Sequence, residues 1–204
     1  MDKREIILDS AIKLFSTKGF EGTSVREIAK EAEVNVAMIN YYFLSKEKLF
    51  ESVVEYKASF LKGVFNELIN KNTLSPIEKI DIIIDHIIER KFCNREFYHL
   101  LHRELSLEHR PQLRDAISDI LLKNMIPVKA IIQNGINEGV FRSVDIELTL
   151  TTVIGTIHYL LTSDTMCRKL LGKKKDFNPF NNKKLKERLS LHTKQLMRAH
   201  LLKK

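Results

Sequence analysis

Residues 23–50 read TSVREIAKEAEVNVAMINYYFLSKEKLF, and this stretch decides how the rest of the chain is interpreted. Ser24 is followed three residues later by Glu27, which is the spacing of a capping box at the start of a helix. Apolar residues then recur at steps of three and four, as on the buried face of a helix: Val25, Ile28, Ala29 and Ala32. The pattern therefore predicts a short amphipathic helix that begins near residue 25.

A second short helix is expected after Asn35, its N-cap, with Val34, Ile39 and Phe43 continuing the buried side. One side of it carries only small or uncharged residues: Val36, Ala37, Met38, Asn40 and Tyr41. A solvated helix face normally carries Lys and Glu, so we expect this face to meet a specific partner. Ser45 should cap a third helix, whose first turn holds Lys46 and Lys48. Because cations there oppose the helix dipole, a nearby anion such as phosphate would account for them.

The segment from Ala11 to Leu49 reads AIKLFSTKGFEGTSVREIAKEAEVNVAMINYYFLSKEKL. Together with the residues back to Ile6, it resembles the DNA-binding domain of the TetR/AcrR family of bacterial transcriptional regulators. Two positions depart from the family pattern. Glu33 stands in a turn where the family often has Gly, and Leu44 stands where Gly or a polar residue is common. A positive φ angle at Glu33 would cost about 1 kcal/mol.

The resemblance implies an all-α protein in two parts. Residues 1–50 would form a three-helix helix-turn-helix DNA-binding domain, and residues 51–204 a helical effector-binding and dimerisation domain. The implied function is transcription regulation in a bacterial cytoplasm, most often repression. In that case a small, largely apolar effector releases a homodimer from a palindromic operator in double-stranded DNA. The resemblance implies neither catalysis nor a cofactor.

The resemblance also assigns DNA contacts. Phosphate contacts, which fix register without reading sequence, would come from Thr23, Ser24, Tyr41, Tyr42, Lys46 and Lys48. Base contacts would come from Arg26, Val36, Ala37, Met38 and Asn40. Asn40 could pair with adenine, Arg26 with guanine, and Ala37 or Met38 could touch a thymine methyl group. Three assignments have a plain alternative, because Arg26 could be solvated or ion-paired, Met38 could fill the core, and Tyr42 could be a surface ring.

The remaining sequence predicts further helices: one before the motif at residues 3–17, then helices at residues 45–69, 76–91, 95–108, 145–162 and 183–202. Between the helices at residues 95–108 and 145–162, a longer helix is expected to begin at Arg110-Pro111, and Pro127 should kink or divide it.

The last helix carries an apolar seam at alternating steps of four and three: Leu185, Leu189, His192, Leu196 and Ala199. In the family the last two helices dimerise, and Gly155 would permit close approach here.

A ligand pocket is implied in the larger part. We expect it between the helices that carry Phe65, Ile84, Phe97, Leu101, Met125 and His158. Mostly apolar walls with one or two polar groups would suit a lipophilic effector. The alternative for each of these residues is a plain place in the core, and for His158 a hydrogen-bonded one.

Composition narrows the function classes. The chain has 204 residues, 44% hydrophobic and 29% charged, with only 7 Gly and 4 Pro, which favours a soluble helical protein. The net charge is +8, but the excess of positive charge does not lie in the proposed DNA-binding domain. Residues 168–204 hold 13 Lys/Arg against 2 Asp/Glu, whereas residues 1–60 hold 9 Lys/Arg against 10 Asp/Glu. Two cysteines are too few for a disulfide framework and suit a reducing cytoplasm. We expect neither a signal peptide nor a membrane span.

Two rival functions remain from the sequence. One is a helical metal-binding or enzymatic protein that carries an incidental helix-turn-helix, since His99, His102, Glu104 and His109 could be imagined as zinc ligands. Against it, the chain has no phosphate-binding glycine loop, G-x-S-x-G elbow or H-E-x-x-H motif, and we expect no metal. The other is a helical interaction module that does not bind DNA.

Overall fold

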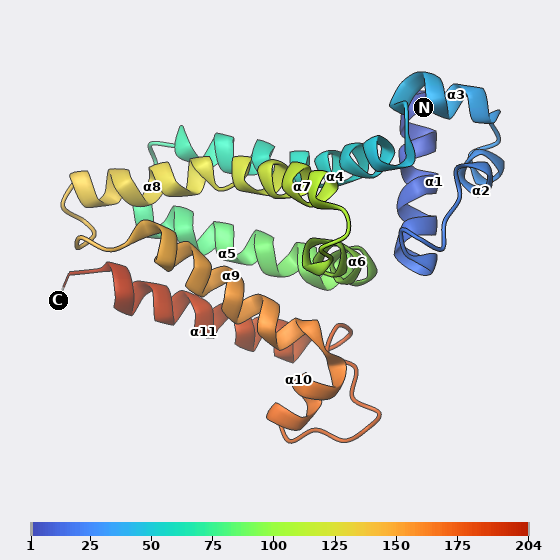
Figure 1. The fold of residues 1–204 in the computed structure, drawn as a ribbon. Coiled ribbons are helices and arrows are strands. Elements are labelled where there is room, and N and C mark those ends of the chain that lie inside the picture. The colour runs from blue at the N-terminus through green and yellow to red at the C-terminus, as the bar shows by residue number, and fades with distance from the viewer. Residues whose placement is uncertain (1, 204) are drawn as a thin grey trace. The chain divides into compact units, whose positions relative to one another are not determined.

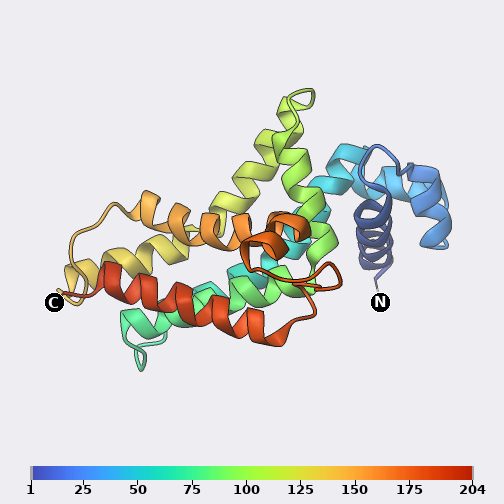
Figure 2. The same ribbon diagram turned by 90° about the horizontal axis from the view of Figure 1, so that it is seen from below.

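The computed structural model describes residues 2–203, and its fold is all-α, as predicted (Figures 1 and 2). Outside the helices, the described residues form one isolated antiparallel bridge, between Phe141 and Leu202. The helices follow in the order α1 Lys3–Lys18, α2 Val25–Glu31, α3 Val36–Phe43, α4 Lys46–Ile69, α5 Pro76–Cys93, α6 Arg95–Ser106, α7 Pro111–Lys123, α8 Ile126–Asn137, α9 Ile146–Thr162, α10 Asp164–Leu170 and α11 Lys183–Leu201.

The chain divides into two compact units. The first runs up to Phe60 and resumes with Glu96–Asn124, so it contains α1 to α3, the first part of α4, α6 and α7. The second comprises Leu61–Arg95 and the chain from Met125 onward, with α5 and α8 to α11. The predicted functional boundary at residue 50 stays a prediction, but the first compact unit includes two helices from beyond it.

The starts of α2 and α3 in the first unit follow the predicted capping signals. Ser24 and Glu27 form the capping box at α2, because the Ser24 Oγ accepts from the Glu27 backbone nitrogen and Glu27 Oε2 accepts from the Ser24 nitrogen. The Asn35 side chain accepts a 2.8 Å hydrogen bond from the Met38 nitrogen and caps α3. These local bonds satisfy backbone donors that a helix end leaves free. They therefore fix where α2 and α3 begin.

Three phenylalanine rings form the centre of the first unit. Phe15 of α1, Phe20 of the following loop and Phe50 of α4 are fully buried, with ring centroids 5.2 to 5.6 Å apart. Around them pack the apolar faces of α2, α3, α6 and α7. Aromatic rings at this spacing add to the stability gained by burial alone. The cluster holds α1, the loop after it and α4 together.

The turns on either side of α3 both use positive φ angles at non-glycine residues. Glu33 has φ 51° and Leu44 has φ 65°, the two positions where the sequence departs from the family pattern. Glu33 therefore bears the cost of a positive φ angle that the sequence analysis considered. The side chain of each residue is exposed, so the strain is confined to the backbone.

In the second unit, α5 packs against α8 and α11, and α9 packs against α8, α10 and α11. The helix expected after Pro111 is divided, as predicted near Pro127: α7 ends at Lys123 and α8 begins at Ile126. One helix was not predicted. α10 has only seven residues, too few to show an apolar period, and it is capped by the Ser163 side chain.

The predicted seam of α11 is not a single face. Leu185 and Leu189 are only 6% and 5% exposed and belong to the core of their own unit. That buried row continues at steps of four through Thr193, whose hydroxyl donates to the Leu189 carbonyl oxygen. The remaining members of the seam, His192, Leu196 and Ala199, are exposed beside Leu191, which is 58% exposed. The polar Thr193 hid the true period, because a back-bonded threonine can stand in an apolar row.

Candidate nucleic-acid interface

α3 presents an uncharged ridge on the surface of its unit. The helix VAMINYYF contains no acidic or basic residue. Ile39 and Phe43 are buried, whereas Ala37, Asn40 and Tyr41 are exposed, Tyr41 to 81%. Val36 and Met38 are half-buried and pack against the core. The ridge around Asn40 is thus available to a partner, while Val36 and Met38 also serve packing.

The start of α2 lies in the same unit and is fixed by charge as well as by capping. Lys18 Nζ donates a 2.7 Å hydrogen bond to Glu27 Oε1. This bond, followed by the hydrogen bonds from Ser24, lowers the pKa of Glu27 to about 2. The exposed side chains of Ser24 and Arg26 therefore stand on a fixed helix end. Both could reach a ligand without rearrangement of α2.

Thr23 and Lys46, two of the predicted phosphate contacts, are engaged inside the unit. The Thr23 side chain is buried, and its hydroxyl donates to the carbonyl oxygens of Gly19 and Leu14. Lys46 Nζ donates to the carbonyl oxygens of Phe20 and Thr23 at 3.0 and 3.2 Å. These carbonyl groups account for the cation in the first turn of α4 without an external anion. Phosphate contacts by Thr23 and Lys46 stay predictions, and they would compete with these bonds.

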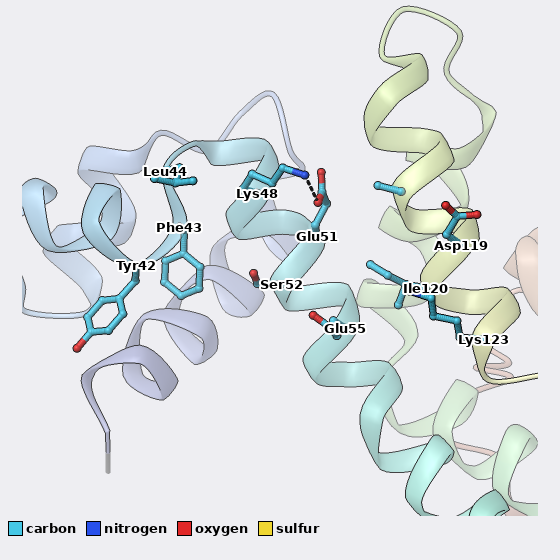
Figure 3. Close-up of a pocket in the computed structure, with 11 residues that line it drawn as sticks. Tyr42, Phe43, Leu44, Lys48, Glu51, Ser52, Glu55, Asp119, Ile120 and Lys123 are labelled. Carbon is cyan, nitrogen blue, oxygen red and sulfur yellow. Dashed lines mark hydrogen bonds and ion pairs between the residues drawn. The ribbon is translucent and has the colours of Figure 1, made fainter.

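Lys48 and Tyr42 lie at a groove of about 440 Å³ between the start of α4 and α7 (Figure 3). Lys48 Nζ is 2.7 Å from Glu51 Oε2, and its side chain is largely exposed. The groove is also lined by polar and charged side chains from both helices: Ser52, Glu55, Asp119 and Lys123. Its mixture of signs gives no preference for an anion. The groove therefore gives no support to the phosphate contacts predicted for Tyr42 and Lys48, and these contacts stay predictions.

The six predicted ligand residues are divided between the two units, and a pocket that joins them stays a prediction. Phe97 and Leu101 belong to the core of the first unit, and Phe65, Ile84 and Met125 to that of the second. An apolar cavity of about 20 Å³ in the second unit is lined by Ile84 and Met125 among others. This volume holds about one water molecule, so it is a packing gap. His158 is half-buried on α9 beside Thr162, whose hydroxyl donates to the His158 carbonyl oxygen.

Within residues 2–203 no three His, Cys, Asp or Glu side chains are grouped so that they could hold a metal ion. Glu104, imagined as a zinc ligand, instead forms an ion pair with Arg110. None of the described helices combines the length and the apolar character needed to cross a membrane. Cys93 and Cys167 are free thiols, the first exposed and the second buried.

Sequence reasoning missed one group of residues at this site. Arg103 of α6 and Arg110, directly before α7, contact the loop between α1 and α2, and Glu104 pairs with Arg110. Arg110 and its partner Glu21 in that loop are 89 positions apart in the sequence. No local pattern marks such a pairing, and only an alignment in which the positions co-vary could have shown it.

Comparison with known proteins gives consistent matches. Residues 7–53 match the family model described as "Bacterial regulatory proteins, tetR family". The protein named "Probable HTH-type transcriptional regulator YttP" of Bacillus subtilis is 35% identical over 133 residues, which are 65% of this chain and 64% of YttP. The biofilm operon icaADBC HTH-type negative transcriptional regulator IcaR of Staphylococcus aureus is 32% identical over 103 residues, half of this chain and 53% of IcaR. The chain thus spans between half and two thirds of these relatives.

Among solved structures, the fold resembles that of the transcriptional regulator FadR from Bacillus subtilis in complex with stearoyl-CoA. The TM-score is 0.76 at 22% identity, covering 95% of this chain and 96% of FadR. A second similar structure is that of AibR in complex with isovaleryl coenzyme A and operator DNA, with a TM-score of 0.69 at 18% identity, over 96% of this chain and 97% of AibR. At these identities the likeness establishes the fold.

Proposed function

Because the chain belongs to the tetR family of bacterial regulatory proteins, we propose that it is a DNA-binding transcriptional regulator that places α3 in the major groove. The observation that carries this proposal is the exposed, uncharged ridge of α3 on a unit whose helix ends are capped and ion-paired. Such a ridge can approach base edges without unpaired charges of its own. Asn40 is the principal base-reading residue, since its amide can pair with adenine.

The remaining contacts divide as the family resemblance implies. Arg26 and Ala37 join Asn40 at the bases, with Val36 and Met38 beside them in half-buried positions. Ser24, Tyr41, Tyr42 and Lys48 hold phosphates, and Thr23 and Lys46 support them from inside the unit. The low net charge of residues 1–60 means that few cations contribute. Affinity should therefore fall with salt by a shallow slope.

We further propose that the protein acts as a homodimer in the bacterial cytoplasm. α9 and α11 supply the interface, because both expose large apolar side chains, among them Leu148, Tyr159 and Leu191. A two-fold dimer places two copies of α3 about one or more DNA turns apart, so the operator is palindromic. As IcaR is named a negative regulator, we take repression as the outcome.

The proposed effector is a small, largely apolar molecule. FadR of Bacillus subtilis and AibR, both of similar fold, are described with bound acyl-coenzyme A molecules, and the cavity beside Ile84 and Met125 is wholly apolar in its lining. At about 20 Å³, that cavity must open to admit any such ligand. An effector that releases DNA must prefer the non-binding conformation, and the coupling is reciprocal.

The test is gel retardation with DNA from upstream of the protein's own gene, repeated over a salt series against random DNA of equal length. A specific complex that survives higher salt than the random one supports the proposal. Equal affinity for both DNAs, at every salt concentration, contradicts it. Sequencing the fragments that the purified protein selects from random DNA then gives the operator and shows whether it is palindromic.

A further inference from the structure

The loop of residues 19–24 determines where α2 begins. It leaves α1 at Gly19, which has φ 80°, and enters α2 at the capping residue Ser24. Phe20 is buried in the aromatic cluster, and the Thr23 hydroxyl bonds back to the Gly19 carbonyl oxygen. A displacement of this loop therefore moves the N-terminus of α2 and, with it, Ser24.

Cations from two other parts of the unit meet on the Phe20 ring. Lys46 Nζ of α4 and the guanidinium carbon of Arg110, directly before α7, each lie 4.3 Å from its centroid. This distance is within the range of cation–π attraction. The Arg103 guanidinium of α6 lies against Gly19, because a Cβ built there would be 2.2 Å from Arg103 Nη2. Lys46 and Arg110 thus hold the loop at Phe20, and Arg103 contacts it at Gly19.

A buried carboxylate fixes the position of Arg110. The Glu104 side chain is 2% exposed, and its Oε2 lies 2.5 Å from Arg110 Nη2. The other terminal nitrogen of Arg110, Nη1, donates a 2.7 Å hydrogen bond to Glu21 Oε1 in the loop. A buried charge is costly unless paired, so Glu104 keeps the guanidinium in place. The planar fork of arginine can serve both carboxylates at once, which a lysine cannot.

We propose that Arg110 is a positioning residue for DNA binding: together with Glu104 it clamps the loop of residues 19–24 and so sets α2 for contact with the operator. The proposal rests on the proposed function. The junction of α6 and α7 lies outside the residues that match the family model. In this proposal it helps to position the helices that contact DNA. A shift of Arg110 away from the loop would release Phe20 and Glu21 together.

The decisive variant is Arg110→Lys, which keeps a cation near Glu104 but loses the second hydrogen bond and the planar contact with Phe20. Arg114→Lys on α7 is the matched control, since the Arg114 guanidinium is partly exposed and lies 3.6 Å from its neighbour Asp115. Three quantities are measured for each: the affinity for the selected operator and for random DNA, the slope of affinity against salt, and hydrogen exchange of the amides of residues 19–24. A double variant, Glu104→Gln with Arg110→Gln, removes the buried charges as a pair should the lysine variant not fold.

For Arg110→Lys we expect specific affinity to fall about tenfold, with an unchanged salt slope, and exchange in residues 19–24 to accelerate. Arg114→Lys should behave as the wild type. In the double variant, which removes the cation, a slope reduced by about one would make Arg110 a direct phosphate contact and overturn the proposal, as would unchanged exchange in Arg110→Lys. If the wild type itself shows no specific binding, the proposed function fails, and the exchange measurement still decides whether Arg110 holds the loop.

Discussion

The backbone nitrogen of Ser45 donates a 2.7 Å hydrogen bond to the carbonyl oxygen of Phe43. The bond spans Leu44, which has φ 65° and ψ −46°, the geometry of a γ-turn with positive φ. Such turns are rare and strained. This one directs the chain from α3 into α4, so strain is stored at the end of the proposed reading helix.

Leu44→Gly should raise the free energy of unfolding by up to about 1 kcal/mol, because glycine adopts positive φ without the steric cost of a Cβ. The Leu44 side chain is 80% exposed, so little packing is lost. Urea denaturation followed by circular dichroism measures the change as a higher midpoint at an unchanged slope. Glu33→Gly, at the other positive-φ turn, should shift the midpoint in the same direction. A lower midpoint for Leu44→Gly would mean that the turn is not strained.

Asn40→Ala should weaken specific operator binding by about 1–3 kcal/mol and leave the melting temperature nearly unchanged. The side chain of Asn40 is exposed, and only its backbone carbonyl takes part in the turn, accepting from the Leu44 nitrogen. Fluorescence anisotropy with operator and random duplexes measures both affinities. Asn66→Ala, another exposed helical asparagine, is the control and should bind as the wild type. Equal losses on the two duplexes would show that Asn40 does not read bases.

Signals that act within three or four residues were readable from the sequence. The capping box of Ser24 and Glu27 and the cap at Asn35 are both present, and α2 and α3 begin at the residues these caps predict. The division of helices near Pro127 follows from the proline ring itself. Each of these features depends on the residue and its immediate neighbours, so no tertiary structure was needed to find it.

Features that depend on distant partners were not readable. The hydrogen bonds of the Lys46 ammonium group to carbonyl oxygens 26 and 23 residues away were not predicted. The contact of Arg110 with Glu21 spans 89 positions. The predicted seam of α11 combined residues of two faces because Thr193 interrupts the apolar row. In each case the environment of the side chain is set by packing, which the period of one helix does not contain.

Glu27→Gln should lower stability at neutral pH, and the difference from the wild type should vanish as the pH falls. The hydrogen bond from Lys18, followed by those from Ser24, holds the pKa of Glu27 at about 2, below its ordinary value of 4.5. A depressed carboxyl pKa stabilises the fold above the unfolded pKa, and the contribution is lost as the group is protonated. The window of loss therefore lies between about pH 4.5 and 2. Glutamine keeps the length of the side chain, so the variant isolates the charge.

Urea denaturation of both proteins from pH 7 down to pH 2.5 provides the measurement. The two midpoints should converge over the acid part of this range. Glu67→Gln, an exposed change on α4 with no capping role, serves as control and should run parallel to the wild type. A constant gap between Glu27→Gln and the wild type at all pH values would show that the charge of Glu27 contributes nothing.

Gly155→Ala distinguishes a free surface on α9 from a dimer interface. Gly155 lies inside α9, and a Cβ built on it meets no atom within 4 Å. In an isolated chain, alanine there should stabilise the helix by about 1 kcal/mol. If a partner helix approaches closely at this point, as the proposed dimer requires, the added methyl group must instead clash across the interface. The dimer dissociation constant should then rise, although the monomer is more stable.

Gly63→Ala is the matched control, because Gly63 also lies inside a helix, α4, with no atom within 4 Å of a built Cβ. Sedimentation velocity over a concentration series gives the dissociation constant of each variant, and thermal unfolding at low concentration gives the monomer stability. Gly63→Ala should stabilise the chain without changing its association. If Gly155→Ala behaves identically, no partner helix lies against Gly155, and the two copies of α3 must be brought to one operator through another surface.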